Sequence, residues 1–279
     1  MQVITHAEGL TPFHGALFVP TMGALHEGHY TLVRAAVQRR DPLRRMPKVI
    51  VSIFVNPTQF GDPNDLARYP RWQNLDVAGC KNAGADAVFA PPAEVIYPPD
   101  RPVAVPRLPE VATRPGLEDA HRPGHFAGVC QVVKRLFELV RPSAAFFGEK
   151  DWQQLCVISA MTTAERLGVD IVPVPTVREP DGLAMSSRNM FVIGEERERA
   201  TALFQALRAT QKCSTPREAE NAMLETLRSR NINPEYAVVR DAKTLMPLPE
   251  DWSRSRPARA LIAAPLGSVR LIDNAAWPA

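Results

Sequence analysis

The stretch that decides the fold is Phe18-Val-Pro-Thr-Met-Gly-Ala-Leu-His-Glu-Gly-His29. Residues 16–19 are uniformly apolar, which is typical of a strand buried in a parallel sheet, and Pro20 removes a ladder donor and is expected to end that strand. Gly23 lets the backbone come close to a ligand, and after Gly28 apolar residues recur at helical spacing. We therefore predict a strand, a polar turn and a helix in succession.

His26 and His29 are spaced so that both imidazoles can share the first turn of a helix over 30–40. Such a helix directs unpaired N–H groups and its positive dipole end into the crevice beyond the strand, which favours phosphate. Neutral imidazoles can add hydrogen-bond donors. The alternatives are two solvated histidines or a metal pair, and zinc is disfavoured because no third Cys or His follows at local spacing.

The composition is that of an ordinary soluble globular chain, with 279 residues, 45% hydrophobic and 23% charged. A net charge of +3, with basic and acidic residues interspersed, predicts no nucleic-acid partner. The four cysteines are far apart and form no Cys-x-x-Cys pair, which favours free thiols in a reducing compartment. The first residues do not resemble a signal peptide and no apolar run reaches membrane-spanning length, so we expect a cytoplasmic protein without a membrane partner.

Strands and helices are expected to alternate over the first 175 residues. Apolar, β-branched runs predict strands at 16–19, 49–55, 87–90, 144–147 and 170–174, and helical spacing predicts helices at 30–40, 71–82, 129–140 and 152–167. An exposed connection at 39–48 and Pro-rich loops over much of 91–124 complete this part. The order predicts an α/β fold, a Rossmann-like parallel sheet with helices on both faces.

The pattern changes at Thr176. A polar loop follows, then two helices at 195–211 and 216–229. Three short strands come after them, at 236–240, 260–264 and 269–272. They favour a small α+β domain with antiparallel strands. We therefore place a nucleotide-binding domain at 1–175 and a second domain at 176–279.

Polar clusters follow the strands that end at Val19, Val55 and Phe147, and such ends meet at the ligand-binding edge of a parallel sheet. Lys150 could reach a phosphate oxygen there, although a lone lysine at a helix start is more often solvated. The spacing is not that of a Walker A loop. Ser186, Ser187 and Arg188 form a second set of donors. They lie in a loop that could move and bind a polyphosphate.

Other polar residues near these clusters have both a binding and a structural interpretation. Gln59 and Gln154 are neutral amides that could hold hydroxyls and a carboxylate, or could be surface residues. Asp151 could cap the helix that starts at Trp152, contact the nucleotide or hold Mg²⁺, and we favour the first two. No nucleophile stands beside a base, so a covalent acyl-enzyme is not indicated. The donors favour nucleotidyl transfer, in which the protein positions reactants and stabilises charge on the α-phosphate and the leaving pyrophosphate.

The segment 20–29 resembles the variant HIGH signature of the pantoate-beta-alanine ligases, or pantothenate synthetases, within the HIGH-type nucleotidyltransferase superfamily. The resemblance continues in order along nearly the whole chain. Its further motifs are Ser52-Ile-Phe-Val-Asn-Pro-Thr-Gln-Phe60, Asp65-Leu-Ala-Arg-Tyr-Pro-Arg71, Arg122-Pro-Gly-His-Phe126, Phe147-Gly-Glu-Lys-Asp-Trp-Gln-Gln154, Asp181-Gly-Leu-Ala-Met-Ser-Ser-Arg-Asn189 and Leu271-Ile-Asp-Asn274.

The resemblance implies ATP-dependent condensation of (R)-pantoate with beta-alanine, with Mg²⁺, through a pantoyl-adenylate that forms with release of pyrophosphate and then loses AMP. It also implies a homodimer whose C-terminal domain, 176–279, is a lid with a KMSKS-like loop. By this resemblance the catalytic residues are His29, as the proton donor, with His26 and Lys150. Pantoate would bind to Gln59 and Gln154, and beta-alanine would lie near Gln59. The implied ATP site comprises Met22, Gly23, Ala24, Leu25, His26, Glu27, Gly28, His29, Gly148, Glu149, Lys150, Asp151, Val177, Met185, Ser186, Ser187 and Arg188.

Two other functions fit the same fold. One is a HIGH-type cytidylyl- or adenylyltransferase acting on a phosphorylated metabolite, which the neutral pair Gln59 and Gln154 disfavours because a phosphate calls for Arg or Lys. The other is a non-catalytic nucleotide-binding regulator, which the intact set of histidines, lysine, serine and arginine disfavours.

Overall fold

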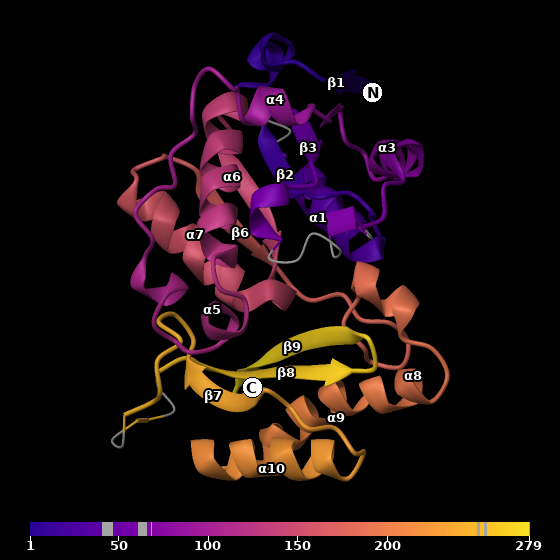
Figure 1. Cartoon of the computed structure of the whole chain (residues 1–279), viewed down its shortest axis with the longest axis vertical. Helices are drawn as coiled ribbons and strands as arrows, with labels where there is room; N and C mark the ends of the chain where they lie inside the picture. The colour runs from indigo at the N-terminus through magenta and orange to yellow at the C-terminus, as the bar shows by residue number, and fades with distance from the viewer. Residues whose placement is uncertain (41–46, 61–65, 68, 250–251, 254–255, 279) are drawn as a thin grey trace.

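A computed structural model of the chain describes residues 1–40, 47–60, 66–67, 69–249, 252–253 and 256–278. Its larger part is built on a sheet of six parallel strands in the spatial order β1-β4-β3-β2-β5-β6 (Figure 1). The expected parallel α/β fold is therefore confirmed. The strands are β1 Gln2–Ile4, β2 Leu17–Thr21, β3 Val49–Ile53, β4 Ala87–Phe89, β5 Ala144–Gly148 and β6 Asp170–Val174.

Neighbouring residues of each strand pack on opposite faces of the sheet, because side chains alternate along a strand. On one face Leu17 and Val19 pack with α1 (Glu27–Gln38) and α3 (Gln73–Asn82). On the other face Phe18 packs with α6 (His125–Val140) and α7 (Trp152–Ala164). Burying an apolar side chain of this size stabilises the fold by roughly 1.5–3 kcal/mol. Helices therefore cover both faces, as the uniformly apolar strands predict.

The chain reverses the direction in which it adds strands between β2 and β5. After β2 it adds β3 and β4 on one side, and it then crosses to place β5 and β6 on the other. β2 pairs with β3 along its whole length but with β5 only at Leu17 and Phe18. The ladder between β2 and β5 thus ends before their carboxyl ends. Such a switch point is where open parallel sheets bind ligands.

Pro20 lies inside β2, which continues to Thr21, so the expectation that this proline ends the strand after Val19 was wrong. The N–H of Leu17 donates to Lys48 O, on the side of β3. Because N–H groups alternate in direction along a strand, the nitrogen of Pro20 faces β5. β5 no longer pairs with β2 at that level, so the missing N–H costs no ladder bond.

Several short elements were not expected from the sequence. β1 pairs with β4, and the segment 91–124 contains α4 (Ala93–Ile96), η3 (Glu110–Ala112) and α5 (Glu118–His121). Each is too short to show a hydrophobic period, which is why sequence patterns miss it. Most of the connection expected to be exposed at 39–48 lies outside the described residues.

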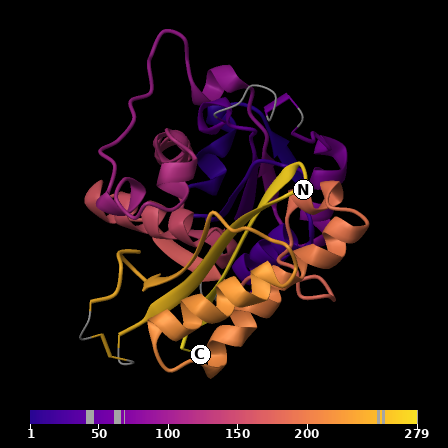
Figure 2. The same ribbon diagram turned by 60° about the horizontal axis from the view of Figure 1, so that its bottom comes forward.

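The chain after β6 forms a smaller unit beneath the carboxyl ends of the parallel strands (Figures 1 and 2). Its antiparallel sheet consists of β7 (Tyr236–Asp241), β8 (Ala258–Leu266) and β9 (Val269–Trp277). Ala260 and Ile262 pack with the helices α8 (Glu195–Ala200), α9 (Ala202–Ala209) and α10 (Pro216–Arg228). Leu261, between them, belongs to the core of the larger part.

The α+β character expected for this region is confirmed, while a boundary at 175/176 stays a prediction. The single helix expected at 195–211 is divided, with α8 ending at Ala200 and α9 beginning at Ala202. Within the described part of the chain, no helix is long and apolar enough to cross a membrane.

Candidate active site

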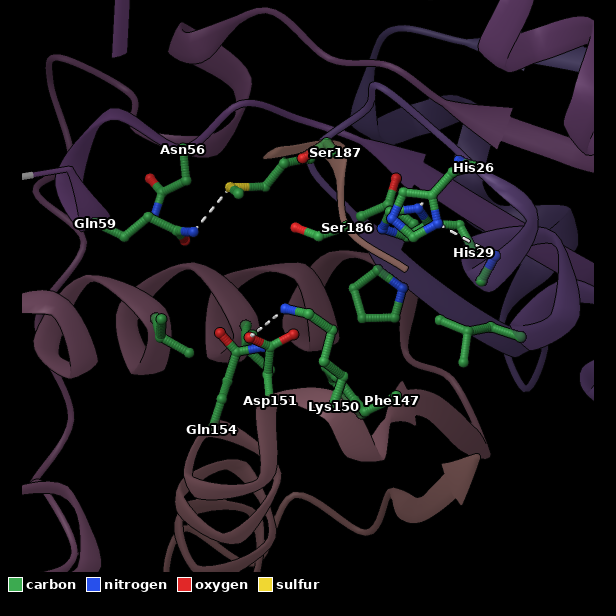
Figure 3. Close-up of a pocket in the computed structure, with 18 of the residues that line it drawn as sticks. His26, His29, Asn56, Gln59, Phe147, Lys150, Asp151, Gln154, Ser186 and Ser187 are labelled. Atoms are coloured by element: carbon green, nitrogen blue, oxygen red, sulfur yellow. Dashed lines mark hydrogen bonds and ion pairs between the residues drawn. The ribbon is translucent and has the colours of Figure 1, made fainter. Parts of the chain in front are cut away.

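The segments expected to bind a nucleotide meet at one cavity of about 240 Å³ (Figure 3). A second cavity of about 610 Å³, bordered by β9, lies next to it. We call these segments the histidine segment (22–29), the lysine segment (148–151) and the serine segment (185–188). The expected site residues that line the smaller cavity are Met22, His26, Gly28, His29, Gln59, Gly148, Lys150, Asp151, Gln154, Val177, Met185, Ser186, Ser187 and Arg188.

The remaining expected residues lie beside the cavity rather than on its lining. Gly23, Ala24 and Leu25 are buried behind it. Glu27 is exposed and forms an ion pair with Arg34 on the outside of α1. Glu149, the other residue of this group, pairs with Arg259.

The two histidines form a reciprocal cap at the start of α1. Nδ1 of His26 accepts the N–H of Gly28 at 3.1 Å, and Nδ1 of His29 accepts the N–H of His26 at 3.3 Å. The backbone N–H of His29 bonds to His26 O. The helix start therefore does not offer its N–H groups freely to a phosphate, contrary to expectation, because the histidines themselves cap them.

This cap fixes the protonation state of both rings. A neutral imidazole that accepts at Nδ1 carries its hydrogen on Nε2. Burial, with the charge of Lys150, lowers the pKa of His26 to about 4, and burial, with the neighbouring His26, lowers the pKa of His29 to about 3. Both rings line the cavity and lie 4.1 Å apart between centroids. They are therefore neutral Nε2–H donors near pH 7.

Asp76, on α3, holds the histidine segment from behind. Its carboxylate oxygens accept the N–H groups of Ala24 at 2.9 Å and of Leu25 at 2.8 Å, and its side chain is almost completely buried. Burial raises the pKa of Asp76, although the two hydrogen bonds favour its charged form. Gly23 has φ +88°, and a Cβ there would lie 3.1 Å from Asp76 Oδ2. Sequence patterns missed this residue, since an Asp within an expected helix carries no special signal.

Gln59 is held at the cavity by the buried Asn56, which caps the short 3-10 helix Pro57–Gln59 after β3. Nδ2 of Asn56 donates to Gln59 Oε1 at 3.2 Å, and Oδ1 accepts from Tyr97 at 2.8 Å. Nε2 of Gln59 lies 2.8 Å from the sulfur of Met22 (Figure 3). A Cβ on Gly128 of α6 would lie 2.4 Å from Thr58 O. This glycine therefore lets the segment that carries Gln59 approach α6 closely.

The adjacent residues Gln153 and Gln154 have different roles. Gln153 is buried and bonds to Val111 O and Asp119 Oδ1, both at 2.9 Å, so it fixes the loop before α6. Gln154 lines the cavity, and Figure 3 shows it on the same side as Lys150 and Asp151. The structure thus places the second amide of the expected pair at the site.

Cations from three parts of the chain surround one carboxylate of the lysine segment, that of Asp151. Nζ of Lys150 lies 3.8 Å from Asp151 Oδ1. Burial alone would raise the pKa of Asp151, but nearby cations hold that pKa below its usual range. In order of influence these cations are Lys150, Arg122 and Arg188. Asp151 makes no side-chain cap to α7, so that expectation was wrong. An excess of positive charge over one carboxylate suits a polyphosphate.

His125, the first residue of α6, has the opposite hydrogen-bonding polarity to the other two rings. Its Nδ1 lies 3.1 Å from the carbonyl of Gln59, which can only accept, so Nδ1 carries the hydrogen and Nε2 a lone pair. Burial, with the charge of Arg122, lowers the pKa of His125 to about 4. The ring lines the same cavity. It is a hydrogen-bond acceptor in a site otherwise rich in donors.

The serine segment closes the cavity on the side of the smaller unit. Met185 N–H bonds to Val177 O at 2.9 Å, and Arg178 pairs with Ala184 in a β-bridge, so a narrow hairpin presents the segment. Ser186 Oγ accepts the N–H of Arg188 at 3.3 Å. The segment therefore has a defined shape that its local contacts set.

The sequence matches the family model of pantoate-beta-alanine ligase over residues 6–276. The chain belongs to this family. It is 49% identical to the pantothenate synthetase of Myxococcus xanthus over 94% of its own length and 88% of that protein. It is also 49% identical to the pantothenate synthetase of Rubrobacter xylanophilus, over 93% and 90% of the two chains. This family member is therefore similar to such synthetases along nearly its whole length.

Solved structures agree with the family assignment. The pantothenate synthetase of Thermus thermophilus superposes with a TM-score of 0.89 and 41% identity, with 99% of both chains covered. A pantoate-beta-alanine ligase from Francisella tularensis, in complex with beta-gamma ATP and beta-alanine, gives a TM-score of 0.76 at 32% identity, over 99% of this chain and 97% of that one. The fold of the family thus extends over this whole chain.

Proposed function

We propose that this protein is the ATP-dependent ligase that condenses (R)-pantoate with beta-alanine to pantothenate, through a pantoyl-adenylate. The single observation that carries the assignment of roles is that the histidine, lysine and serine segments line one cavity together with Gln59 and Gln154. Membership of the pantoate-beta-alanine ligase family supports the same reaction.

In the first half-reaction the pantoate carboxylate attacks the α-phosphate of ATP and pyrophosphate leaves. His26 and His29 offer neutral Nε2–H groups, and Lys150 adds a mobile ammonium, so all three can stabilise charge that develops on the phosphates. The low pKa of His29 means that it supplies a hydrogen bond rather than a full proton in the free protein. The neutral amides of Gln59 and Gln154 suit the hydroxyls of pantoate.

In the second half-reaction the amine of beta-alanine attacks the acyl carbon, the bond to AMP breaks, and the amine loses a proton. A group that accepts a hydrogen bond from an amine is required, and Nε2 of His125 has that polarity. Arg122, three residues earlier in the same cavity, supplies a cation for the carboxylate of beta-alanine. The beta-alanine found in the Francisella tularensis relative supports a site for this substrate.

Mg²⁺ is proposed to enter with ATP. No group of three or more His, Cys, Asp or Glu side chains within the described ranges could hold a metal ion. The donor set fits an ion carried mainly by phosphate oxygens, with Asp151 as the carboxylate within reach of the cavity. When bound in this way, the ion neutralises charge on the phosphates.

The remaining features of the family are proposed for this chain as well. They are a homodimer, a cytoplasmic location, a division into domains 1–175 and 176–279, and closure of the serine segment over ATP. Closure predicts that protease cleavage at Arg188 slows when nucleotide is added.

Exchange of labelled pyrophosphate into ATP tests the proposed reaction. Pantoate without beta-alanine is expected to support exchange, because adenylate formation is reversible and precedes amide formation. Exchange that requires beta-alanine, or none above background, would contradict the adenylate mechanism. A phosphorylated analogue of pantoate is expected to be inactive, and its activity would favour a nucleotidyltransferase of another substrate.

A further inference from the structure

The C-terminal strand β9 is hydrogen-bonded to the lysine segment through one buried side chain, that of Asn274. Nδ2 of Asn274 donates to the carbonyl oxygens of Glu149, at 3.0 Å, and Lys150, at 2.8 Å. Asn274 itself is only 3% exposed. Two consecutive carbonyls held by one amide leave the turn little freedom, because a change in its backbone breaks at least one of the two bonds.

A buried arginine fixes the orientation of this amide. Nε of Arg259 donates to Asn274 Oδ1 at 2.5 Å, which directs Nδ2 toward the lysine segment. Nη2 of Arg259 also bonds to Glu149 Oε2 at 2.9 Å. The guanidinium carbon lies 3.4 Å from the ring centroid of Trp152, at the start of α7. Arg259 therefore touches the turn on both sides of Lys150 and holds Asn274 in place.

The residue before Asn274 holds the hairpin that presents the serine segment. The carboxylate of Asp273 accepts two hydrogen bonds from Arg178, at 2.6 and 3.0 Å, and is almost completely buried. Arg178 also donates to Gly182 O, within the hairpin that presents the serine segment. One dipeptide of β9 is thus joined directly to the lysine segment, and through Arg178 to the hairpin that presents the serine segment.

We propose that Asn274 is a positioning residue that acts through Lys150, and that Asp273-Asn274 sets the distance between the lysine and serine segments. This inference rests on the proposed function. It assigns a role to the motif 271–274, although Asn274 does not line the nucleotide cavity. It also makes β9 part of the nucleotide site, so that the lysine segment and β9 move together.

The test uses Asn274→Asp, which keeps the oxygen that accepts from Arg259 but places a second oxygen against the two carbonyls. We expect kcat for pantoate-dependent pyrophosphate exchange to fall on the order of 10- to 100-fold, because the backbone that carries the Lys150 side chain is no longer held in place. In a Lys150→Ala background the same substitution is expected to change kcat by no more than about twofold. If the Asn274→Asp variant does not fold, Asn274→Ala is used in the same assay, with the same expected fall in kcat.

A matched control separates positioning from loss of stability. Glu220, on α10, also bonds to a backbone group of the smaller unit, the N–H of Val239 at 2.9 Å, but lies on neither cavity. Glu220→Ala is expected to leave exchange unchanged. Normal exchange in Asn274→Asp, or full additivity with Lys150→Ala, would overturn the inference while the wild type stays active. Absence of exchange in the wild type would instead overturn the proposed function, and the inference with it.

Discussion

The histidine and lysine segments face each other across one cavity but are held in place by different means. The helix start in the histidine segment is shaped by neighbours in sequence, since His26 and His29 cap it reciprocally. The backbone just before that cap is supported by Asp76 of α3. The lysine segment is held by Asn274 and Arg259, which are more than a hundred positions away. A local motif can therefore be recognised from the sequence with its geometry, whereas the position of Lys150 depends on the complete fold.

The difference also concerns charge. The histidine segment presents neutral donors, because burial keeps the rings unprotonated. The lysine segment presents the ammonium of Lys150 beside Asp151, and the guanidinium groups of Arg122 and Arg188 also lie near that carboxylate. Neutral donors can stabilise charge at the reacting phosphate through directed hydrogen bonds, while the cations hold the polyphosphate as a whole. The comparison predicts that the two segments are both needed for turnover but respond differently to substitution and to pH.

The largest expected effects come from removing one donor on either side. Lys150→Ala and His29→Ala are each expected to lower kcat for exchange about a hundredfold or more, the usual cost of losing a transition-state donor. Steady-state kinetics of exchange would show this. Lys134→Ala is the control, because Lys134 pairs with Glu165 on the outside of α6 and is expected to have no effect. A change confined to KM would mean that the two residues bind substrate and transition state equally.

A smaller effect is expected where the segment that carries Gln59 packs against α6. Gly128→Ala would place a Cβ 2.4 Å from Thr58 O, and the neighbour is backbone that must shift. We expect a loss of about 1–3 kcal/mol in the free energy of unfolding, as for overpacking elsewhere, with a higher KM for pantoate. Denaturant unfolding and pantoate titration measure the two effects. Unchanged stability would show that the close approach is not required.

The support of the histidine segment can be weakened from behind. Asp76→Asn leaves one of two backbone donors without a carboxylate oxygen and is expected to cost about 1–3 kcal/mol of unfolding free energy, together with part of the exchange activity. Asp119→Asn is a matched control, since Asp119 also accepts two consecutive N–H groups, at Gly116 and Leu117. It is expected to lower stability and leave exchange nearly unchanged. Equal losses of activity in both variants would contradict a specific role for Asp76.

The smallest expected change is in the protonation of the His26 and His29 rings between pH 8 and pH 5. With pKa values near 4 and 3, His26 and His29 stay neutral through pH 6.5, where an ordinary histidine takes up a proton. The unfolded chain binds those protons first, so their contribution to stability is complete above about pH 6.5 and declines as the pH falls toward the folded values. Long-range ¹⁵N correlation spectra are expected to show Nε2–H rings at pH 6. Titration near 6.5 would contradict the cap.

Local sequence patterns were enough to predict the strand, turn and helix around His26 and His29, the parallel sheet and the three segments that line the shared cavity, because apolar periodicity and short motifs are local properties. They did not reveal the hydrogen bonds of Asp76, His125 and Asn274, since no local pattern marks a side chain whose partner lies elsewhere in the chain. Pro20 is the same case in the backbone, because only the ladder on each side of β2 shows that its missing N–H faces an unpaired edge. These contacts follow from the complete fold, since each depends on which distant segment comes within hydrogen-bond distance.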